Sequence, residues 1–457
     1  ESISPFSQLQ RHSPPSSRGF PAAASSDGQL SPRRRRLAPI HHSTPMETDK
    51  KMMSPLTDLS DHILAEIFLL LPAAEDLARA SAACVSFRRL VTDRSFLRRF
   101  RRLHAPPLLG FLDRDGFHPA VPPHPSAPAA RALSLAADFT FSFLPSNCRW
   151  AVRDIRDGRV LLDRQLEEGE ELPVFTQLVV CDPLHRRYIL LPPVPDDLAA
   201  SVEDPVPIFL DCICHPILIP PSAEEAAAAA EETKFRVIWL ARCKIKFYIF
   251  VFSSSTGHWR LAASQSLTDL LGESTMMTLT HPLFIGCYHA CGCIYWQLLM
   301  DDSGTEFLVL DTQRMEFSIA DHPPKGWNTG GLGIVEAGED RLGMFRIIAE
   351  TAEADLRYII GGNRGLSSTQ WQVEKTISLD SEYRYSVQAS SGRYLLLDRR
   401  KARPYENYSL DGPQMEYFSV DVETLQLERL WGKPISATSL PHLYINFPPS
   451  LLPSPTV

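Results

Sequence analysis

The sequence predicts a multidomain α+β protein in which a small all-α segment precedes a large all-β domain. Apolar residues recur at helical spacing between residues 54 and 104, and from about residue 131 the pattern changes to short strands separated by polar turns. A length of 457 residues also exceeds that of one typical domain. We therefore divide the chain into an aperiodic segment (1–53), the helical segment (54–104), a Pro-rich linker (105–130) and the β domain (131–457).

The composition of the chain limits the classes of protein to which it can belong. Apolar residues make up 44% of the chain, enough for a globular core, and the net charge of −8 gives no overall signature of nucleic-acid binding. Nine cysteines are scattered through the chain, which is typical of free thiols in a reducing compartment, so we expect the nucleus, the cytoplasm or both. No apolar run approaches the roughly 18 residues of a membrane span.

The first 53 residues are rich in Ser, Pro and Arg, and we expect them to be disordered. The sequence begins at Glu1 and its first methionine is Met46, so the preceding residues are either untranslated upstream sequence or the start of a fragment. The run Arg33 to Arg36 is either a nuclear-import patch or a solvated cluster of charge.

The helical segment is predicted to contain four short helices. In the first, Ser60 occupies the N-cap position, Asp61 lies in the first turn and Pro72 ends the helix. Its apolar residues recur at helical spacing: Leu59, Ile63, Leu64, Ile67, Phe68 and Leu71.

The three following helices are shorter. Asp76 lies at the start of the second, which carries Leu77. The third lies near residues 84–91, and Asp93 is placed to cap the fourth. The apolar residues of the third and fourth are Val85, Phe87, Leu90, Phe96, Leu97, Phe100 and Leu103.

The first of these helices is apolar on more than one face, although about 45 residues can bury only a small core. Such a helix must be covered by something else. Either the following domain covers it, or the segment is a docking module for a partner protein.

The residues of this segment resemble an F-box. The resemblance is carried by Leu59-x-Asp61-x-Ile63-Leu64-x-Glu66-Ile67-(x)3-Leu71-Pro72, then Leu77, then Cys84-Val85-x-Phe87-Arg88-Arg89-Leu90. Members of that family usually have Pro after the first Leu, where this chain has Ser60. The resemblance implies binding to a Skp-type adaptor and, through it, to a cullin-based ubiquitin ligase. The adaptor-binding residues that it implies are Leu59, Ile63, Leu64, Ile67, Phe68, Leu71, Pro72, Leu77, Val85, Phe87 and Leu90.

The segment 105–130 contains many prolines and is predicted to be a stiff, extended linker. Residues 105–111, which follow Arg-Leu-His, resemble the corresponding joint in a grass-type subfamily of plant F-box proteins.

The β domain repeats one pattern: an apolar strand, a polar turn and a second strand. Clear copies lie at 177–193, 248–263, 306–321 and 416–431, with a fainter copy at 359–376. Glycine-marked strands precede most of them. Four-stranded units at a spacing of roughly 50 residues predict a β-propeller of about six blades.

A propeller must also close its ring, and we expect residues 131–150 to pair with the tail at 438–452. The alternative is a large β-sandwich or two small β domains. The repeats resemble the Kelch-like F-box-associated domains of plants. The Ala-rich insertion at 220–234 is expected to form a surface loop or a short helix.

No motif in the sequence predicts catalysis, and we expect no cofactor. The sets Cys212-x-Cys214-His215 and Cys287-x-His289-x-Cys291-x-Cys293 suggest zinc, but their spacing is unusual, and core packing of free thiols is the alternative. Five tryptophans of the strand region are expected mainly in the cores of the blades: Trp239, Trp259, Trp296, Trp327 and Trp371.

The helical segment is rich in arginine, with seven between Arg88 and Arg102. This charge would serve a nucleic acid, an acidic adaptor or simple solvation, but the aromatic residues needed for base stacking are not interleaved with it.

Taken together, these patterns and the family resemblance predict a non-catalytic substrate-recognition subunit of an SCF-type ubiquitin ligase. Its partners would be a Skp-type adaptor, cullin and an unknown target protein, without nucleic acid or membrane. Two alternatives stay open: a propeller enzyme acting on a sugar or redox substrate, and an adaptor-binding protein without a degradative target.

Overall fold

A computed structural model describes residues 59–71, 74–145, 148–167, 169–170, 173–203, 216–228, 234–243, 246–272, 283–300, 304–320, 331–338, 341–349, 354–361, 371–401, 415–432 and 441–447. The predicted aperiodic segment 1–53, Pro72, Trp327 and the set Cys212-x-Cys214-His215 lie outside these residues.

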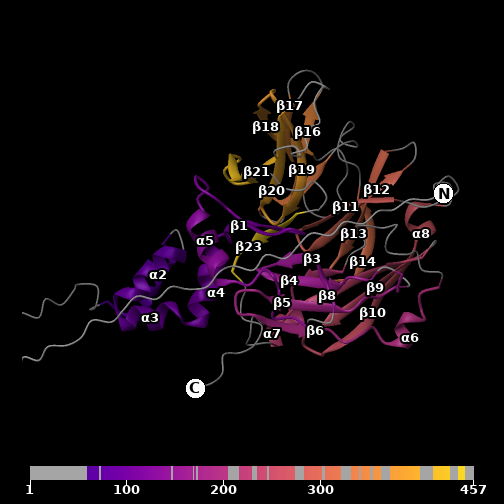
Figure 1. Cartoon of the computed structure of the whole chain (residues 1–457), viewed down its shortest axis with the longest axis horizontal. Helices are drawn as coiled ribbons and strands as arrows, with labels where there is room; N and C mark the ends of the chain where they lie inside the picture. Colours follow the sequence, from indigo (N-terminus) through magenta and orange to yellow (C-terminus); the bar gives the residue numbers. More distant parts are fainter. Residues whose placement is uncertain are drawn as a thin grey trace, which may run out of the picture. The chain divides into compact units, whose positions relative to one another are not determined.

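The four helices predicted for residues 54–104 are confirmed (Figure 1). They are α1 (Asp61–Leu69), α2 (Ala74–Ala83), α3 (Val85–Val91) and α4 (Arg94–Leu103). Asp93 caps α4 as predicted, because its Oδ1 accepts hydrogen bonds from the backbone N–H groups of Ser95 (2.9 Å) and Phe96 (3.0 Å). Cys84 caps α3 in the same way, with its Sγ 3.5 Å from the backbone nitrogen of Phe87.

The β domain is a six-blade propeller, as its repeats predict. Five antiparallel sheets of four strands follow one another along the chain, each with its first strand innermost. Blade I contains β3 (Trp150–Arg156), β4 (Arg159–Arg164), β5 (Leu178–Asp182) and β6 (Arg187–Leu190). Blade II contains β7 (Ile217–Ile219), β8 (Arg236–Arg242), β9 (Lys246–Ser253) and β10 (His258–Ser266).

The next three blades have the same order. Blade III contains β11 (Leu283–Ala290), β12 (Cys293–Met300), β13 (Gly304–Asp311) and β14 (Glu316–Ala320). Blade IV contains β15 (Leu332–Glu336), β16 (Leu342–Ala349), β17 (Ala354–Gly361) and β18 (Gln372–Leu379). Blade V contains β19 (Tyr383–Ser391), β20 (Tyr394–Lys401), β21 (Met415–Asp421) and β22 (Leu427–Trp431). The fainter copy predicted at 359–376 is therefore the outer hairpin of blade IV.

The hydrophobic clusters show that the blades form a closed ring. Each of four clusters joins two consecutive blades, and a fifth joins blade V, the sixth sheet and blade I. Strand β4 shows why its sequence is continuously apolar: Val160 and Leu162 face one cluster, and Leu161 faces the next. Because both faces of a blade are covered, inner strands bury consecutive residues rather than every second one. Trp239, Trp259 and Trp296 lie in these cores, as predicted.

The sixth sheet closes the ring and corrects the sequence prediction. It has the strand order β2-β1-β23, with β1 (Leu108–Asp113), β2 (Gly116–Pro119) and β23 (His442–Ile445) (Figure 1). The tail does supply the closing strand, but its partner is β1, within the segment that was predicted to be a linker. The segment contains an apolar run followed by Asp115-Gly116, which is a hairpin signal that its prolines conceal.

Residues 131–150, expected to pair with the tail, instead contain most of α5 (Ala127–Ala136), which begins with a proline in its first turn and packs on β1 and β2. Three more helices are short: α6 (Asp196–Ala199), α7 (Ala223–Ala228) and α8 (Leu267–Leu271). The predicted insertion thus contains α7. Among the described residues, no helix has the length and apolar character needed to cross a membrane.

The closing sheet depends on one glycine. Gly110 adopts φ +148° where the register between β1 and β23 shifts, and a Cβ there would lie 2.2 Å from the carbonyl oxygen of His118. Only glycine fits this backbone position. The closing strand is also anchored to blade I, because the hydroxyl of Tyr444 donates a hydrogen bond to the carbonyl oxygen of Gly158 (2.7 Å).

The first prediction concerns this closure. Truncation after Thr438 removes β23, including buried Leu443 and Tyr444, and leaves two strand edges unpaired. The free energy of unfolding should fall by at least about 5 kcal/mol, a large part of the stability of a typical domain. Chemical denaturation of the full chain and the truncated chain measures the difference. The control is deletion of residues 227–231 from the Ala-rich insertion, which keeps Glu225 and should change stability little because the length of a connection costs little. Equal stability of the truncated and intact chains would contradict the closure.

The second prediction concerns His124, which lies between β2 and α5 and is 5% exposed. Its Nδ1 accepts a hydrogen bond from the backbone N–H of Ser126 (3.2 Å), so Nε2 carries the proton beside the Ser419 hydroxyl (3.2 Å). Burial lowers the pKa of His124 to about 4, although the Glu428 carboxylate lies 3.6 Å away. Because the folded state binds fewer protons, the stabilisation is present above the ordinary pKa of 6.5 and is lost as the pH falls towards 4.

We therefore expect the wild type to lose roughly 2 kcal/mol relative to His124→Gln between pH 7 and pH 5. Denaturant unfolding of both proteins at the two pH values measures this difference. A difference that is independent of pH would contradict the protonation account.

Candidate functional site: a helical docking surface and the propeller channel

Helix α1 carries two apolar stripes that have different environments. Leu64 and Phe68 are 3% and 7% exposed and face the other helices. Ile63, Ile67 and Leu70 follow at spacings of four and three residues and are 47%, 39% and 82% exposed. Their spacing places the three exposed residues on one side of the helix and its C-terminal end. We call Ile63, Ile67 and Leu70, together with Val85 at the start of α3 (81% exposed), the docking surface.

The inner stripe is held by aromatic packing. The rings of Phe68 and Phe87 meet edge to face with centroids 5.0 Å apart. Phe96 and Phe100 of α4 are also buried, and the Phe100 ring stacks on His104 at 4.0 Å. The His104 Nε2 lies 2.8 Å from the carbonyl oxygen of Leu69, which satisfies a carbonyl group at the end of α1.

The structure separates the residues predicted to contact an adaptor into groups. Ile63, Ile67 and Val85 are exposed, whereas Leu59, Leu71 and Leu90 are partly buried. Leu64, Phe68, Leu77 and Phe87 are buried inside the helical segment, so these four form its own core and cannot provide its exposed surface. The sequence analysis omitted Leu70 from the predicted contacts, although the apolar spacing 63, 67, 70 marks the outer stripe.

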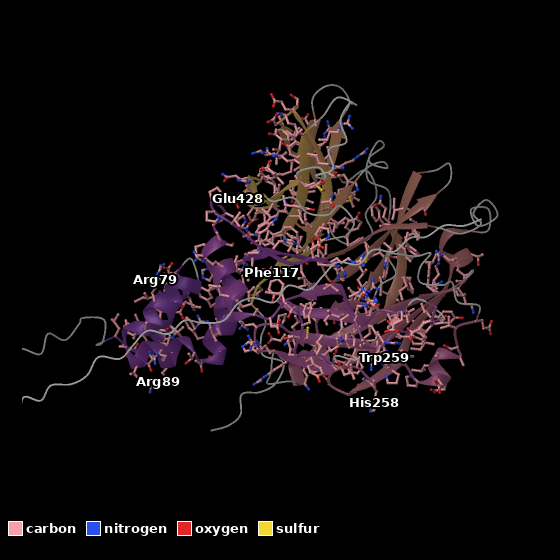
Figure 2. All side chains as sticks on the ribbon, in the orientation of Figure 1. Arg79, Arg89, Phe117, His258, Trp259 and Glu428 are labelled. Carbon is pink, nitrogen blue, oxygen red and sulfur yellow. The ribbon has the colours of Figure 1, made fainter. Side chains whose placement is uncertain are left out.

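Two arginines of the basic run are neutralised within the segment. Arg89 of α3 forms an ion pair with Asp61 (3.1 Å), and Arg99 of α4 forms one with Glu66 (2.7 Å). Arg89 can be located on the helices in Figure 2. The hydrogen bond from Arg99 lowers the pKa of Glu66. These two arginines therefore pair α3 and α4 with the acidic side of α1. The sequence analysis, which assigned the charge to a nucleic acid, an acidic adaptor or solvation, did not foresee these ion pairs.

The propeller contains a channel of about 500 Å³ lined by the inner strands of all six blades. Strands β3, β7, β11, β15, β19 and β23 each contribute residues to its wall. Apolar side chains that are at least partly exposed form one part of the wall, namely Ile285, Val387 and Ile445. Polar side chains form the rest, including Arg153, Asp154, Arg156, His289, Glu336, Gln388 and His442.

The carboxylates of the channel are engaged by neighbouring groups. Asp154 accepts hydrogen bonds from the backbone N–H of Ile155 (2.8 Å) and of Leu218 (2.7 Å). Burial nevertheless raises the pKa of Asp154 to about 6. Glu336 accepts a hydrogen bond from the backbone N–H of Cys291 (3.1 Å), and Arg153 pairs with Asp163 at 2.9 Å.

Burial lowers the pKa of both channel histidines, His289 to about 3 and His442 to about 4. Both imidazoles are therefore neutral near pH 7, and each can donate one hydrogen bond and accept another. Burial also raises the pKa of the Cys287 thiol well above its usual range, which keeps it protonated.

The cysteine-rich set of β11 does not converge on a metal centre. Cys287 and His289 line the channel, Cys293 is buried in the core between blades III and IV, and Cys291 lies in the β11–β12 turn with φ 51°. The two-residue spacing of Cys291 and Cys293 would place them on one face of a single strand, but Cys291 lies in the turn and Cys293 begins β12, so they do not share a face. Within the described ranges, no group of three or more His, Cys, Asp or Glu is arranged to hold a metal ion.

Comparison with known families identifies the helical segment. Residues 56–99 match the F-box domain. This range spans α1, α2 and α3 and extends into α4, so the docking surface and the buried aromatic pair both lie within it. No curated protein matches the chain.

Several solved β-structures resemble the chain weakly. An α-L-arabinanase from Penicillium chrysogenum has 9% identity and a TM-score of 0.33, with 62% of this chain and 82% of that one covered. The β-propeller domain of the Trilobed protease from Pyrococcus furiosus has 11% identity and a TM-score of 0.31 (62% and 71% covered). The WD40 domain of SCAP from fission yeast has 9% identity and a TM-score of 0.30 (66% and 81% covered). These values are too low to transfer an activity to this chain.

The third prediction separates the two stripes of α1 by stability. Leu64→Ala removes a side chain from the core and should cost about 2–5 kcal/mol in the helical segment. Ile63→Ala, the matched control one residue earlier, should cost less than about 1 kcal/mol because its side chain is half exposed. Amide hydrogen exchange of α1 and α3 in the full chain measures both effects. Equal losses of protection would contradict the assignment of the inner and outer stripes.

Proposed function

We propose that this chain is the substrate-recognition subunit of an SCF-type cullin ubiquitin ligase. In this proposal the F-box binds a Skp-type adaptor, and through it cullin, while the propeller binds a target protein. The observation that carries the proposal is the match of residues 56–99 to the F-box domain, within which an apolar stripe of α1 is exposed. F-box domains in general bind Skp-type adaptors, and a six-blade propeller follows the F-box in this chain.

The docking surface has the chemistry of a protein interface. Ile63, Ile67, Leu70 and Val85 present branched apolar side chains to solvent from two adjacent helices. Burial of a side chain of this size against a partner contributes about 1.5–3 kcal/mol. A cluster of such residues at the centre of an interface supplies most of the binding energy in many complexes.

The subunit would act by proximity, holding a target lysine near a ubiquitin-charged enzyme, without performing bond chemistry itself. We further propose that the propeller is of the Kelch-like type found with F-boxes in plants, and that the complex acts in the nucleus, the cytoplasm or both. The repeated four-stranded sheets support the first of these statements, and the scattered free cysteines support an intracellular location.

The fourth prediction tests adaptor docking without disturbing the core of the F-box. Ile67→Asp places a charge in the docking surface, so the affinity for a Skp-type adaptor should fall at least about tenfold, because the carboxylate loses its hydration in the interface. Titration calorimetry of the full chain with purified adaptor measures this change.

Leu135→Asp is the matched control, because Leu135 is 79% exposed on α5, outside the F-box match. Its affinity for the adaptor should equal that of the wild type. Unchanged binding by Ile67→Asp, with α1 still protected from hydrogen exchange, would refute docking through this surface.

A further inference from the structure

The propeller channel has hydrogen-bond donors without partners. Among the described residues, the side chains of Arg156, His289, Gln388 and His442 line the channel and take part in no hydrogen bond or ion pair. All four are partly exposed, and they come from β3, β11, β19 and β23. The ring thus brings together four polar side chains that lie up to 286 positions apart in the sequence, taking Arg156 and His442. Water or a ligand in the channel must form hydrogen bonds with these groups, because a polar group without a hydrogen bond inside a protein raises the free energy of the folded state.

Two carboxylates of the same channel, Asp154 and Glu336, already accept hydrogen bonds. Both oxygens of Asp154 and one oxygen of Glu336 accept backbone N–H groups, and Arg153 already pairs with Asp163. Asp157 lies at the turn after β3 and is exposed. The groups left to bind a ligand are therefore a guanidinium, which only donates hydrogen bonds, and a carboxamide and two neutral imidazoles, which both donate and accept them. The channel lining carries two arginines, Arg153 and Arg156, and three acids, Asp154, Asp157 and Glu336. Arg153 is paired with Asp163, so Arg156 is the cation that can meet a ligand carrying a negative charge.

Arg156 determines the geometry of that ligand. A guanidinium presents two parallel N–H groups that match a planar carboxylate in a bidentate pair. The charges of Asp154 and Arg156 attract each other, but both oxygens of Asp154 accept backbone N–H groups and no hydrogen bond joins the two side chains, so the fork stays open to a ligand. Arg156 is the last residue of β3 and precedes the turn at Asp157 and Gly158, so its position is fixed by the pairing of β3 with β4.

The apolar part of the channel wall favours a ligand whose remaining atoms are apolar. Ile285 of β11 and Val387 of β19 line the channel; Val387 is partly exposed, and Ile285 keeps 40% of its surface exposed. An apolar surface of this kind is stabilised when an organic group covers it. The channel volume of about 500 Å³ lies within the range of small-molecule sites, roughly 300–1,000 Å³.

We propose that the propeller channel binds a small organic carboxylate, whose carboxylate group pairs with Arg156 and whose apolar body lies against Ile285 and Val387. This site is separate from the docking surface of the F-box and does not depend on adaptor binding. A ligand there contacts inner strands of several blades at once, so it would stabilise the closed ring by mass action.

Titration calorimetry of the full chain with benzoate, 2-naphthoate and 4-phenylbenzoate tests the proposal, because the three carboxylates span the size of the channel. We expect at least one of them to bind, and its uncharged carboxamide analogue to bind at least about tenfold more weakly. Absence of binding by all three at millimolar concentration, or equal binding of acid and amide, would overturn the proposal and leave a channel filled with water.

Two variants locate the site. Arg156→Gln should weaken binding of the carboxylate about 10- to 100-fold, the range expected for loss of charged hydrogen bonds. Arg260→Gln is the control, since Arg260 is an exposed arginine on the outer strand β10 and should leave the affinity unchanged. Equal affinity of Arg156→Gln and wild type would refute the site.

Ile285→Trp gives a second measurement that does not depend on Arg156. The larger side chain at a partly exposed position fills the channel, so binding should be lost while the circular dichroism spectrum and the melting temperature stay close to those of the wild type. If Arg156→Gln does not fold, this variant decides alone: loss of binding supports the site, and retained binding overturns it.

Discussion

The structure depends on the antiparallel pairing of β1 with β23, which joins residues 108–113 to residues 442–445. Each blade is apolar on both faces, and each hydrophobic cluster is shared between blades, so no blade can bury its residues alone. The pairing converts an open array into a ring and removes its two exposed edges. Gly110 makes the close approach of β1 to β2 possible, and Tyr444 anchors the closing strand to the first turn of blade I. Bringing two distant segments together costs conformational entropy. Burial of apolar residues in the largest cluster, which contains residues from both ends of the propeller, offsets this cost.

The F-box forms its hydrophobic core from few residues. Its core is limited to one face of each short helix, and a single edge-to-face pair, Phe68 with Phe87, occupies the contact between α1 and α3. Ion pairs from Arg89 and Arg99 to α1 lie at the surface, where solvent screens them, so they add little to the stability that this packing provides. The residues that remain on the outer side of α1 cannot be covered by the segment itself. A small helical unit that exposes a stripe of isoleucines is well suited to complete its burial against another protein.

The channel follows from the geometry of a propeller. The first strand of each four-stranded blade and β23 of the sixth sheet lie innermost, so six strands that are distant in sequence line one space. In that space, backbone N–H groups without a strand partner donate hydrogen bonds to the carboxylates of Asp154 and Glu336. Arg156, whose guanidinium makes no hydrogen bond among the described residues, is the group in this space on which the proposed anionic ligand depends.

The sequence by itself determined the elements of this protein. Apolar periodicity and capping residues such as Asp93 located the four helices, and the repeated strand–turn–strand pattern located five blades, because both signals arise from neighbours in the chain. The sequence could not determine which residues of α1 stay exposed, because Ile63 and Leu64 are equally apolar and only packing against Phe87 and α4 decides between them. It also could not show the partner of the closing strand. The prolines around residues 105–130 suggested a linker, whereas pairing across more than 300 residues with β23 makes Leu108–Asp113 a buried strand. Long-range contacts of this kind leave no periodic trace in the sequence, and for the same reason only the tertiary structure placed Arg156, His289 and His442 around one channel.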